Sequence, residues 1–177
     1  MTGVLCMKGQ NGFSLIELFI VVVIVCLVAA IAVPNLMASR RAANESSAIA
    51  SIRTLHSANM AYASTSGNGE FAGLAGVVDA SSLSDLCDAN LVDTTLGSAS
   101  KSNYVFIGSR QARTVTTVAT FYFAANPSTT FGLVRSGNRR FGVATDGIMK
   151  FDATASTLST PFDERSLQSA IAVPVGD

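Results

Sequence analysis

A long apolar run near the N-terminus constrains this chain more than any other feature. Positions 18–33 read LFIVVVIVCLVAAIAV, sixteen residues without a charged or strongly polar side chain. With residues 13–17 before it and 34–37 after it, the run reaches the length of about 20 residues that a helix needs to cross a bilayer. Buried strands are also rich in β-branched residues, but they extend over only about 4–8 residues. The length therefore predicts a membrane-spanning helix that is apolar on every side.

The flanks of this run argue against a secretory signal peptide and against a plain membrane anchor. A signal peptide has an apolar core of only about 7–15 residues before its cleavage site, although residues 29–32, AAIA, imitate such a site. A plain anchor has no use for a charge at its apolar end, yet Glu17 lies there. Because a carboxylate within a membrane span costs about 2.5–3.5 kcal/mol on insertion scales, we interpret Glu17 as a functional residue.

Composition narrows the function of the whole chain. Lys plus Arg and Asp plus Glu number twelve each, so no net charge attracts nucleic acid, and nucleic acid is not a predicted partner. One histidine and three cysteines without a CxxC pair offer little for a metal site. No P-loop or dinucleotide-binding glycine motif is present. We therefore predict no enzymatic activity and no catalytic residue, cofactor or bound metal.

The residues around the start of the apolar run resemble a known processing signal. Gly12-Phe13-Ser14-Leu15-Ile16-Glu17, followed by the apolar run, is similar to the class III signal of type IV prepilins and type II secretion pseudopilins. The resemblance covers about residues 8–65. It includes Pro34, where many pilins also have proline, and a basic pair at the end of the membrane segment, Arg40 and Arg41.

This resemblance implies how the precursor is processed. A prepilin peptidase would cut between Gly12 and Phe13 and methylate the new amine of Phe13. Residues 1–12 would then be a cleaved leader. Translation could start at Met1 or Met7, and the sequence does not distinguish them.

The same resemblance gives roles to two residues of the apolar segment. The resemblance implies that Glu17 acts in assembly, where the carboxylate of one subunit would meet the Phe13 amine of its neighbour. Pro34 has no backbone N–H to donate within the helix, so we expect a kink or local loosening there.

Beyond the apolar run the sequence predicts a globular head at 37–177. Residues 37–65 continue the helix with one apolar face, on which His56 is interpreted as a packing residue. Residues 66–100 read as an acidic connecting loop whose spacing matches no EF-hand. The sheet region, 101–152, contains four β-branched and aromatic runs predicted as strands: Tyr104–Gly108, Val115–Ala124, Arg140–Ala144 and Ile148–Phe151.

These segments predict an α+β fold. A long N-terminal helix, with a membrane-spanning and filament-core part at 13–36, would pack on a four-stranded antiparallel sheet, as in type IV pilins. Asp146-Gly147 predicts a type I′ hairpin between the last two strands. Many pilins close the C-terminal region with a disulfide, but Cys87 is the single cysteine of the predicted head. How the tail after residue 152 is held is left open.

The resemblance implies a filament subunit. Its partners would be copies of itself, other pilins, the prepilin peptidase and methyltransferase, and an inner-membrane assembly platform with its ATPase. It would cross the bacterial inner membrane once before assembly and then form a surface pilus for adhesion, motility or DNA uptake. The alternatives are a pseudopilin in a periplasmic pseudopilus and, disfavoured by Glu17, an anchored binding protein that never polymerises. A mature length of 165 residues favours a pilin over the smaller major pseudopilin.

Overall fold

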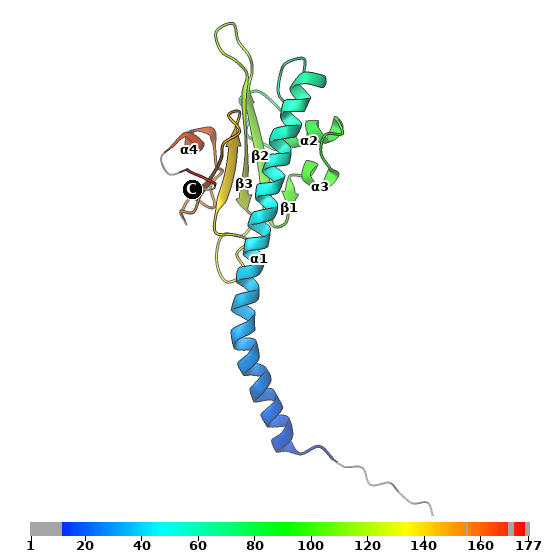
Figure 1. The fold of residues 1–177 in the computed structure, drawn as a ribbon, viewed down its shortest axis with the longest axis vertical. Coiled ribbons are helices and arrows are strands. Elements are labelled where there is room, and N and C mark those ends of the chain that lie inside the picture. Colours follow the sequence, from blue (N-terminus) through cyan, green and yellow to red (C-terminus); the bar gives the residue numbers. More distant parts are fainter. Residues whose placement is uncertain (1–11, 155, 170–171, 176–177) are drawn as a thin grey trace, which may run out of the picture. The chain divides into compact units, whose positions relative to one another are not determined.

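The computed structural model describes residues 12–154, 156–169 and 172–175 (Figure 1). The chain divides into two compact units, Met1–Met37 and Ala38–Asp177. A single α-helix, α1 (Leu15–Thr65), begins in the first unit and ends in the second.

The part of α1 in the first unit is long and apolar enough to cross a membrane. No residue in the most apolar stretch of eighteen residues is buried. Its valine, isoleucine and leucine side chains therefore face away from protein. Pro34 lies inside the helix, which is assigned without a break across it. A proline there cannot donate to the carbonyl four residues earlier, and the kink stays a prediction.

The second unit is built on one antiparallel sheet in which neighbours along the chain are neighbours in space. The prediction of a long helix on an antiparallel sheet is confirmed. The prediction of four strands is wrong, because two-residue strands pair at the two edges and are too short to show a sequence period. The strands are β1 (Ser100–Lys101), β2 (Tyr104–Gln111), β3 (Thr120–Pro127), β4 (Arg140–Ala144), β5 (Met149–Asp152) and β6 (Val173–Pro174).

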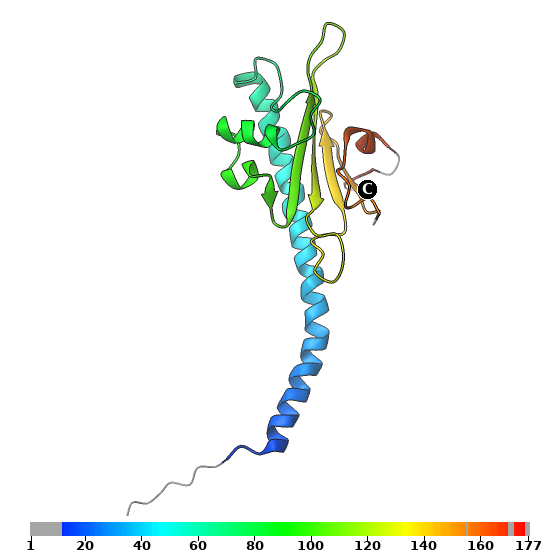
Figure 2. The ribbon, with the colours of Figure 1, turned by 180° about the vertical axis from the view of Figure 1, so that it is seen from behind.

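The main core lies between α1 and one face of this sheet (Figure 2). Because successive strand residues point to opposite faces, Phe121 and Phe123 of β3 enter this core while Tyr122 between them faces the other way. The helix supplies Ala48, Ile52, Leu55 and Ala58. His56 packs its ring on Phe121, with centroids 5.4 Å apart, as expected for a packing residue.

Two short helices, α2 (Ser81–Asp88) and α3 (Thr94–Gly97), occupy much of the segment predicted as an acidic loop. They bury leucines in the main core: Leu83, Leu86 and Leu96. Two acids of this segment make specific contacts. Asp93 caps α3 by accepting the Leu96 N–H at 3.3 Å, and Glu70 pairs with Arg110.

Two further local predictions need correction. β3 begins at Thr120 instead of Val115, because the Thr114 hydroxyl accepts the N–H groups of Thr116 and Thr117 and forms a side-chain turn. The hairpin between β4 and β5 is confirmed, but type I′ is wrong. That turn requires positive φ at both central residues, and only Gly147, at 74°, has it.

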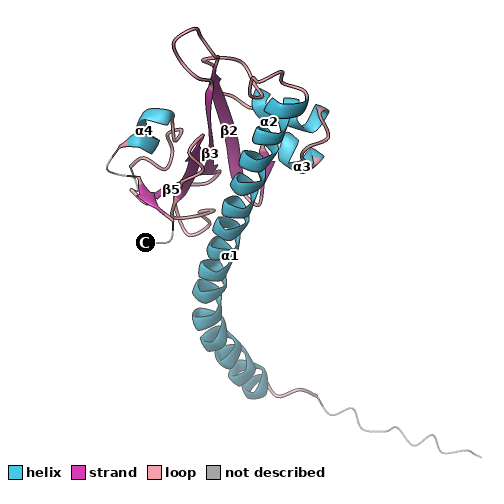
Figure 3. Cartoon of the chain, turned by 45° about the horizontal axis from the view of Figure 1, so that its top comes forward, coloured by secondary structure: helices cyan, strands magenta, loops and turns pink. Residues whose placement is uncertain are grey.

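The C-terminal segment covers the other face of the sheet. Its helix α4 (Glu164–Gln168) lies on the opposite side of the sheet from α1 (Figure 3). Phe162 and Leu167 pack there against Tyr122 and Ala124 in a second, smaller core. Gly142 of β4 leaves the space that they fill, since a Cβ at this position would lie 2.5 Å from a Leu167 methyl carbon.

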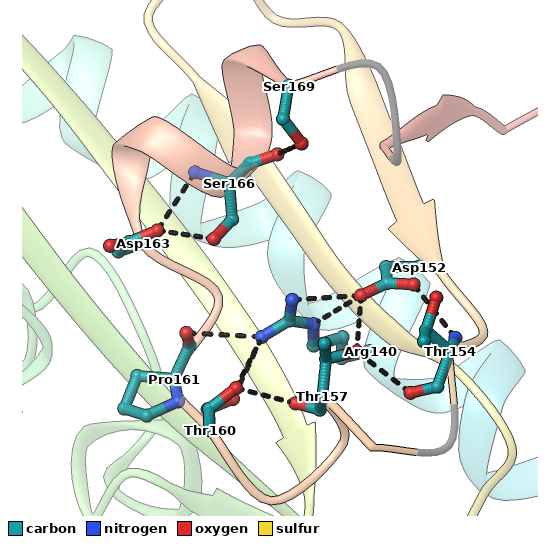
Figure 4. Close-up of polar contacts among 9 residues, drawn as sticks. All are labelled: Arg140, Asp152, Thr154, Thr157, Thr160, Pro161, Asp163, Ser166 and Ser169. Carbon is teal, nitrogen blue, oxygen red and sulfur yellow. Dashed lines mark hydrogen bonds and ion pairs between the residues drawn. The ribbon is translucent and has the colours of Figure 1, made fainter.

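A buried ion pair holds the start of this segment (Figure 4). The Arg140 guanidinium donates to Asp152 Oδ2 through Nε at 2.9 Å and lies 2.8 Å from it through Nη2. Its Nη1 donates to the carbonyls of Thr160 and Pro161 at 3.0 and 3.2 Å. Asp152 also accepts the Thr157 hydroxyl at 2.6 Å. Polar contacts therefore fasten a tail whose attachment the sequence left open.

Candidate processing and assembly site

The predicted cleavage site lies in non-helical chain just ahead of α1. Gly12, Phe13 and Ser14 precede the helix, and all three are exposed. Apart from its chain neighbours, no atom of the described residues lies within 4 Å of the place where a Cβ on Gly12 would stand. The described residues therefore leave the Gly12–Phe13 bond accessible. The predicted cleavage needs this access, because the bond would have to enter the active site of an enzyme. The leader residues before it, with Met1 and Met7, lie outside the described residues.

Local hydrogen bonds explain why the helix starts immediately after this segment. The Ser14 carbonyl accepts the N–H groups of Glu17 and Leu18, both at 3.1 Å, and so closes the first turn. Apolar side chains then continue without interruption, and they favour a helix once water is replaced by lipid or by other helices. Residue 13 consequently lies only two positions before the first helical residue, Leu15.

Glu17 lies in this first turn, close in sequence to the amine that cleavage at residue 13 would free. A carboxylate is favoured at a helix N-terminus, where the N–H groups carry partial positive charge. Its side chain is exposed. The structure thus brings Gly12, Phe13 and Glu17 into one short exposed segment, with Pro34 several turns further along α1.

A buried carboxylate in the second unit was not identified from the sequence as a key contact. Glu45 on α1 is 5% exposed; its Oε1 accepts the Asn138 N–H at 2.7 Å and its Oε2 accepts Arg139 Nε at 2.8 Å. A signal was available, because Glu45 precedes Ile49 and Ile52 by four and seven residues and therefore shares their apolar helix face. An acid on such a face needs a partner.

The described residues contain no group of three or more His, Cys, Asp or Glu side chains placed to hold a metal ion. The chemistry that the N-terminal segment offers is instead a peptide bond open to cleavage, followed by a potential amine and a nearby carboxylate. These are the parts needed for processing and for a charge pair between subunits.

Two comparisons with known proteins found a match. Residues 7–33 match the family model of the prokaryotic N-terminal methylation motif. Over 39 residues the chain is 49% identical to the Type IV wide pilus major component PilA4 of Thermus thermophilus. That match spans 22% of this chain and 30% of the relative, less than a third of its length. No solved structure matches the chain. The methylation motif and the partial match to a pilus component are therefore likenesses to type IV pilin sequences over a small part of the chain.

Proposed function

We propose that this protein is the subunit of a type IV pilus. The observation that carries the proposal is the methylation motif, which matches residues 7–33 and so includes the exposed apolar start of α1. A soluble protein would have to bury such a helix, and a plain anchor would have no use for Glu17. A subunit that waits in a membrane and then packs its helix among other helices uses both features.

Processing is the first step to test. The prepilin peptidase should cut between Gly12 and Phe13 and methylate the new amine of Phe13. Intact-mass measurement of the mature protein should therefore show the loss of twelve residues and the gain of one methyl group. An uncleaved protein, or one cut after Ala32, would contradict the proposal.

Assembly needs a polar interaction to align the subunits. Moving an apolar helix from lipid into a helical bundle changes its hydrophobic environment little, so burial alone selects no register. A pair formed by the Glu17 carboxylate and the Phe13 amine of a neighbour would select one. At about 4 Å and an effective dielectric constant of about 20, two unit charges attract by roughly 4 kcal/mol. The pair would also remove the cost of an unpaired carboxylate in an apolar core.

Substitutions at Glu17 test this role. Glu17→Ala should leave membrane insertion unchanged or improve it, since a charge is removed from the span, and should block or slow fibre growth. Glu17→Asp should retain partial assembly. Both are compared in cells that lack other pilins, by membrane fractionation and by electron microscopy of sheared fibres. Normal fibres from the Glu17→Ala protein would refute the role.

A pseudopilin shares this whole N-terminal segment, so another observation must separate the two functions. The relative that is 49% identical over 39 residues is a type IV pilus component, which favours the pilin. Deletion of the gene should remove surface fibres and leave type II secretion intact. Loss of secreted proteins with normal surface fibres would instead assign the chain to a secretion system.

A further inference from the structure

The loop between β3 and β4 presents an unusual apolar tip. Residues 131–134, Phe-Gly-Leu-Val, form this tip, and the side chains of Phe131, Leu133 and Val134 are 74%, 84% and 71% exposed. Single exposed apolar residues are ordinary, but three of them within four positions of one loop indicate a contact surface.

The tip is displayed by a loop that is firmly attached to α1. The Ser136 carbonyl accepts Asn44 Nδ2 at 3.0 Å, and Glu45 accepts the Asn138 N–H at 2.7 Å. Within the loop, the Ser136 N–H donates to the Thr129 carbonyl at 2.8 Å. Because these contacts fix both sides of residues 131–134, the exposure of the tip is a property of the folded head.

The attachment points lie close to the end of the apolar part of α1. Asn44 and Glu45 follow Met37 by seven and eight residues of continuous helix, a rise of about 10–12 Å. The polar headgroup layer on each side of a bilayer is about 5–8 Å thick. Figures 1 and 2 show the loop beyond the ends of β3 and β4, at the end of the second unit where its part of α1 begins.

Three arginines belong to this loop or to the adjoining turns of α1. Arg40 is exposed, and Arg41 and Arg135 are partly exposed. Arg40 shares a helix face with Asn44, and Arg41 with Glu45, because each pair is four residues apart. The carboxylate of Glu45 is already paired with Arg139. Apolar side chains next to arginines are the combination by which proteins bind an anionic lipid surface.

We propose that the apolar tip enters the headgroup–acyl boundary of the membrane that anchors α1, with Arg40, Arg41 and Arg135 facing anionic headgroups. The inference rests on the proposed membrane anchorage and adds a second contact between the head and the bilayer. In the unassembled subunit this contact would hold the head against the membrane surface and limit its rotation about α1.

Tryptophan fluorescence provides a direct test, because the chain contains no tryptophan. Phe131→Trp places a single reporter in the tip, and Leu133→Trp is a second reporter if the first variant folds poorly. Val115→Trp is the matched control, since Val115 is fully exposed in the loop between β2 and β3. The full-length precursor is reconstituted at a low protein-to-lipid ratio in vesicles of phosphatidylglycerol and phosphatidylcholine.

The expected result is a blue-shifted emission from the tip reporter, with quenching by brominated acyl chains several-fold stronger than for the control. Aqueous acrylamide should quench the control more strongly. Vesicles of phosphatidylcholine alone should reduce the difference between the two reporters.

Two outcomes would overturn the inference. The first is a tip reporter as accessible to acrylamide as the control in protein that resists alkaline carbonate extraction. The second is protection that appears only at high protein-to-lipid ratios, which would assign the tip to contact with another copy of the chain. If alkaline carbonate removes the protein from the vesicles, the proposed membrane anchorage itself is contradicted. Failure of the tip contact and failure of the anchorage are therefore distinguishable.

Discussion

Replacing Asp152 by alanine tests whether a buried ion pair holds the C-terminal segment on the sheet. The side chains of Arg140 and Asp152 are 4% and 1% exposed. Without the carboxylate, the guanidinium keeps neutral acceptors, the carbonyls of Thr160 and Pro161, and the face of the Phe162 ring 4.5 Å away. An uncompensated buried charge costs about 3–5 kcal/mol. We expect Asp152→Ala to lower the free energy of unfolding by this amount.

The pH dependence of stability gives an independent measure. Burial alone would raise the pKa of Asp152, but hydrogen bonds from Thr157, Thr154 and Arg140 outweigh it and lower the pKa to about 2. An aspartate in an unfolded chain has a pKa of about 3.9. A group whose pKa is depressed by folding stabilises the protein above its unfolded pKa, and this contribution disappears as the pH falls from about 4 to 2. The difference of about 1.9 units corresponds to roughly 2.5 kcal/mol.

Urea denaturation of the head, followed by circular dichroism at pH 7 and at pH 2.5, measures both effects. The control is the double variant Arg140→Met, Asp152→Leu, in which no charge is left buried at this site. It should be closer in stability to the natural protein than Asp152→Ala is, because replacing both partners of a buried pair is often nearly neutral. A loss below about 1 kcal/mol for Asp152→Ala, or the same acid sensitivity in the variant and the natural protein, would refute the reasoning.

Four further predictions follow from the second unit. A fragment from residue 41 onward should be soluble and folded, and a circular dichroism spectrum without a cooperative unfolding transition would contradict this. Gly142→Ala should cost about 1–3 kcal/mol in thermal denaturation, because the new methyl group displaces Leu167 from the sheet. Cys87 is free and half-buried, so Cys87→Ser should still assemble into fibres. Burial raises the pKa of Tyr122 to about 12, so alkaline titration should show a loss of stability as the pH rises from about 10 to 12.

The parts of the fold that sequence could predict are those set by local patterns. The membrane-length helix follows from sixteen apolar positions, and β4 begins and ends where its run of residues predicts. The wrong prediction that β3 starts at Val115 also came from a local pattern. Its neighbours have high strand propensity, but Thr114 satisfies the nearby N–H groups with its own hydroxyl, and propensity cannot show that competition.

Contacts between distant residues were not accessible from one sequence. Glu45 and Arg139 are 94 positions apart, and their pairing depends on how the loop between β3 and β4 returns to α1. The edge strand β6 is defined by its pairing with β5, in which Lys150 and Phe151 lie opposite Pro174 and Val173. The predicted cleavage site, in contrast, does not depend on contacts between distant residues. The prediction of Gly12 and Phe13 needs only the short stretch of chain that resembles a prepilin signal.

Two consecutive arginines show how the head does without an internal disulfide among its described residues. Arg139 pairs with Glu45 of α1 and lies 5.2 Å from the Phe151 ring, on the side of the main core. Arg140 pairs with Asp152 and lies over Phe162, on the opposite side. Arg140 is the first residue of β4 and Arg139 directly precedes it. Successive residues of an extended chain point to opposite faces, so a slip of β4 by one residue would turn each arginine toward the wrong face. The two arginines therefore fix the register of β4. Arg139 fastens the helix to one face of the sheet, and Arg140 fastens the tail to the other.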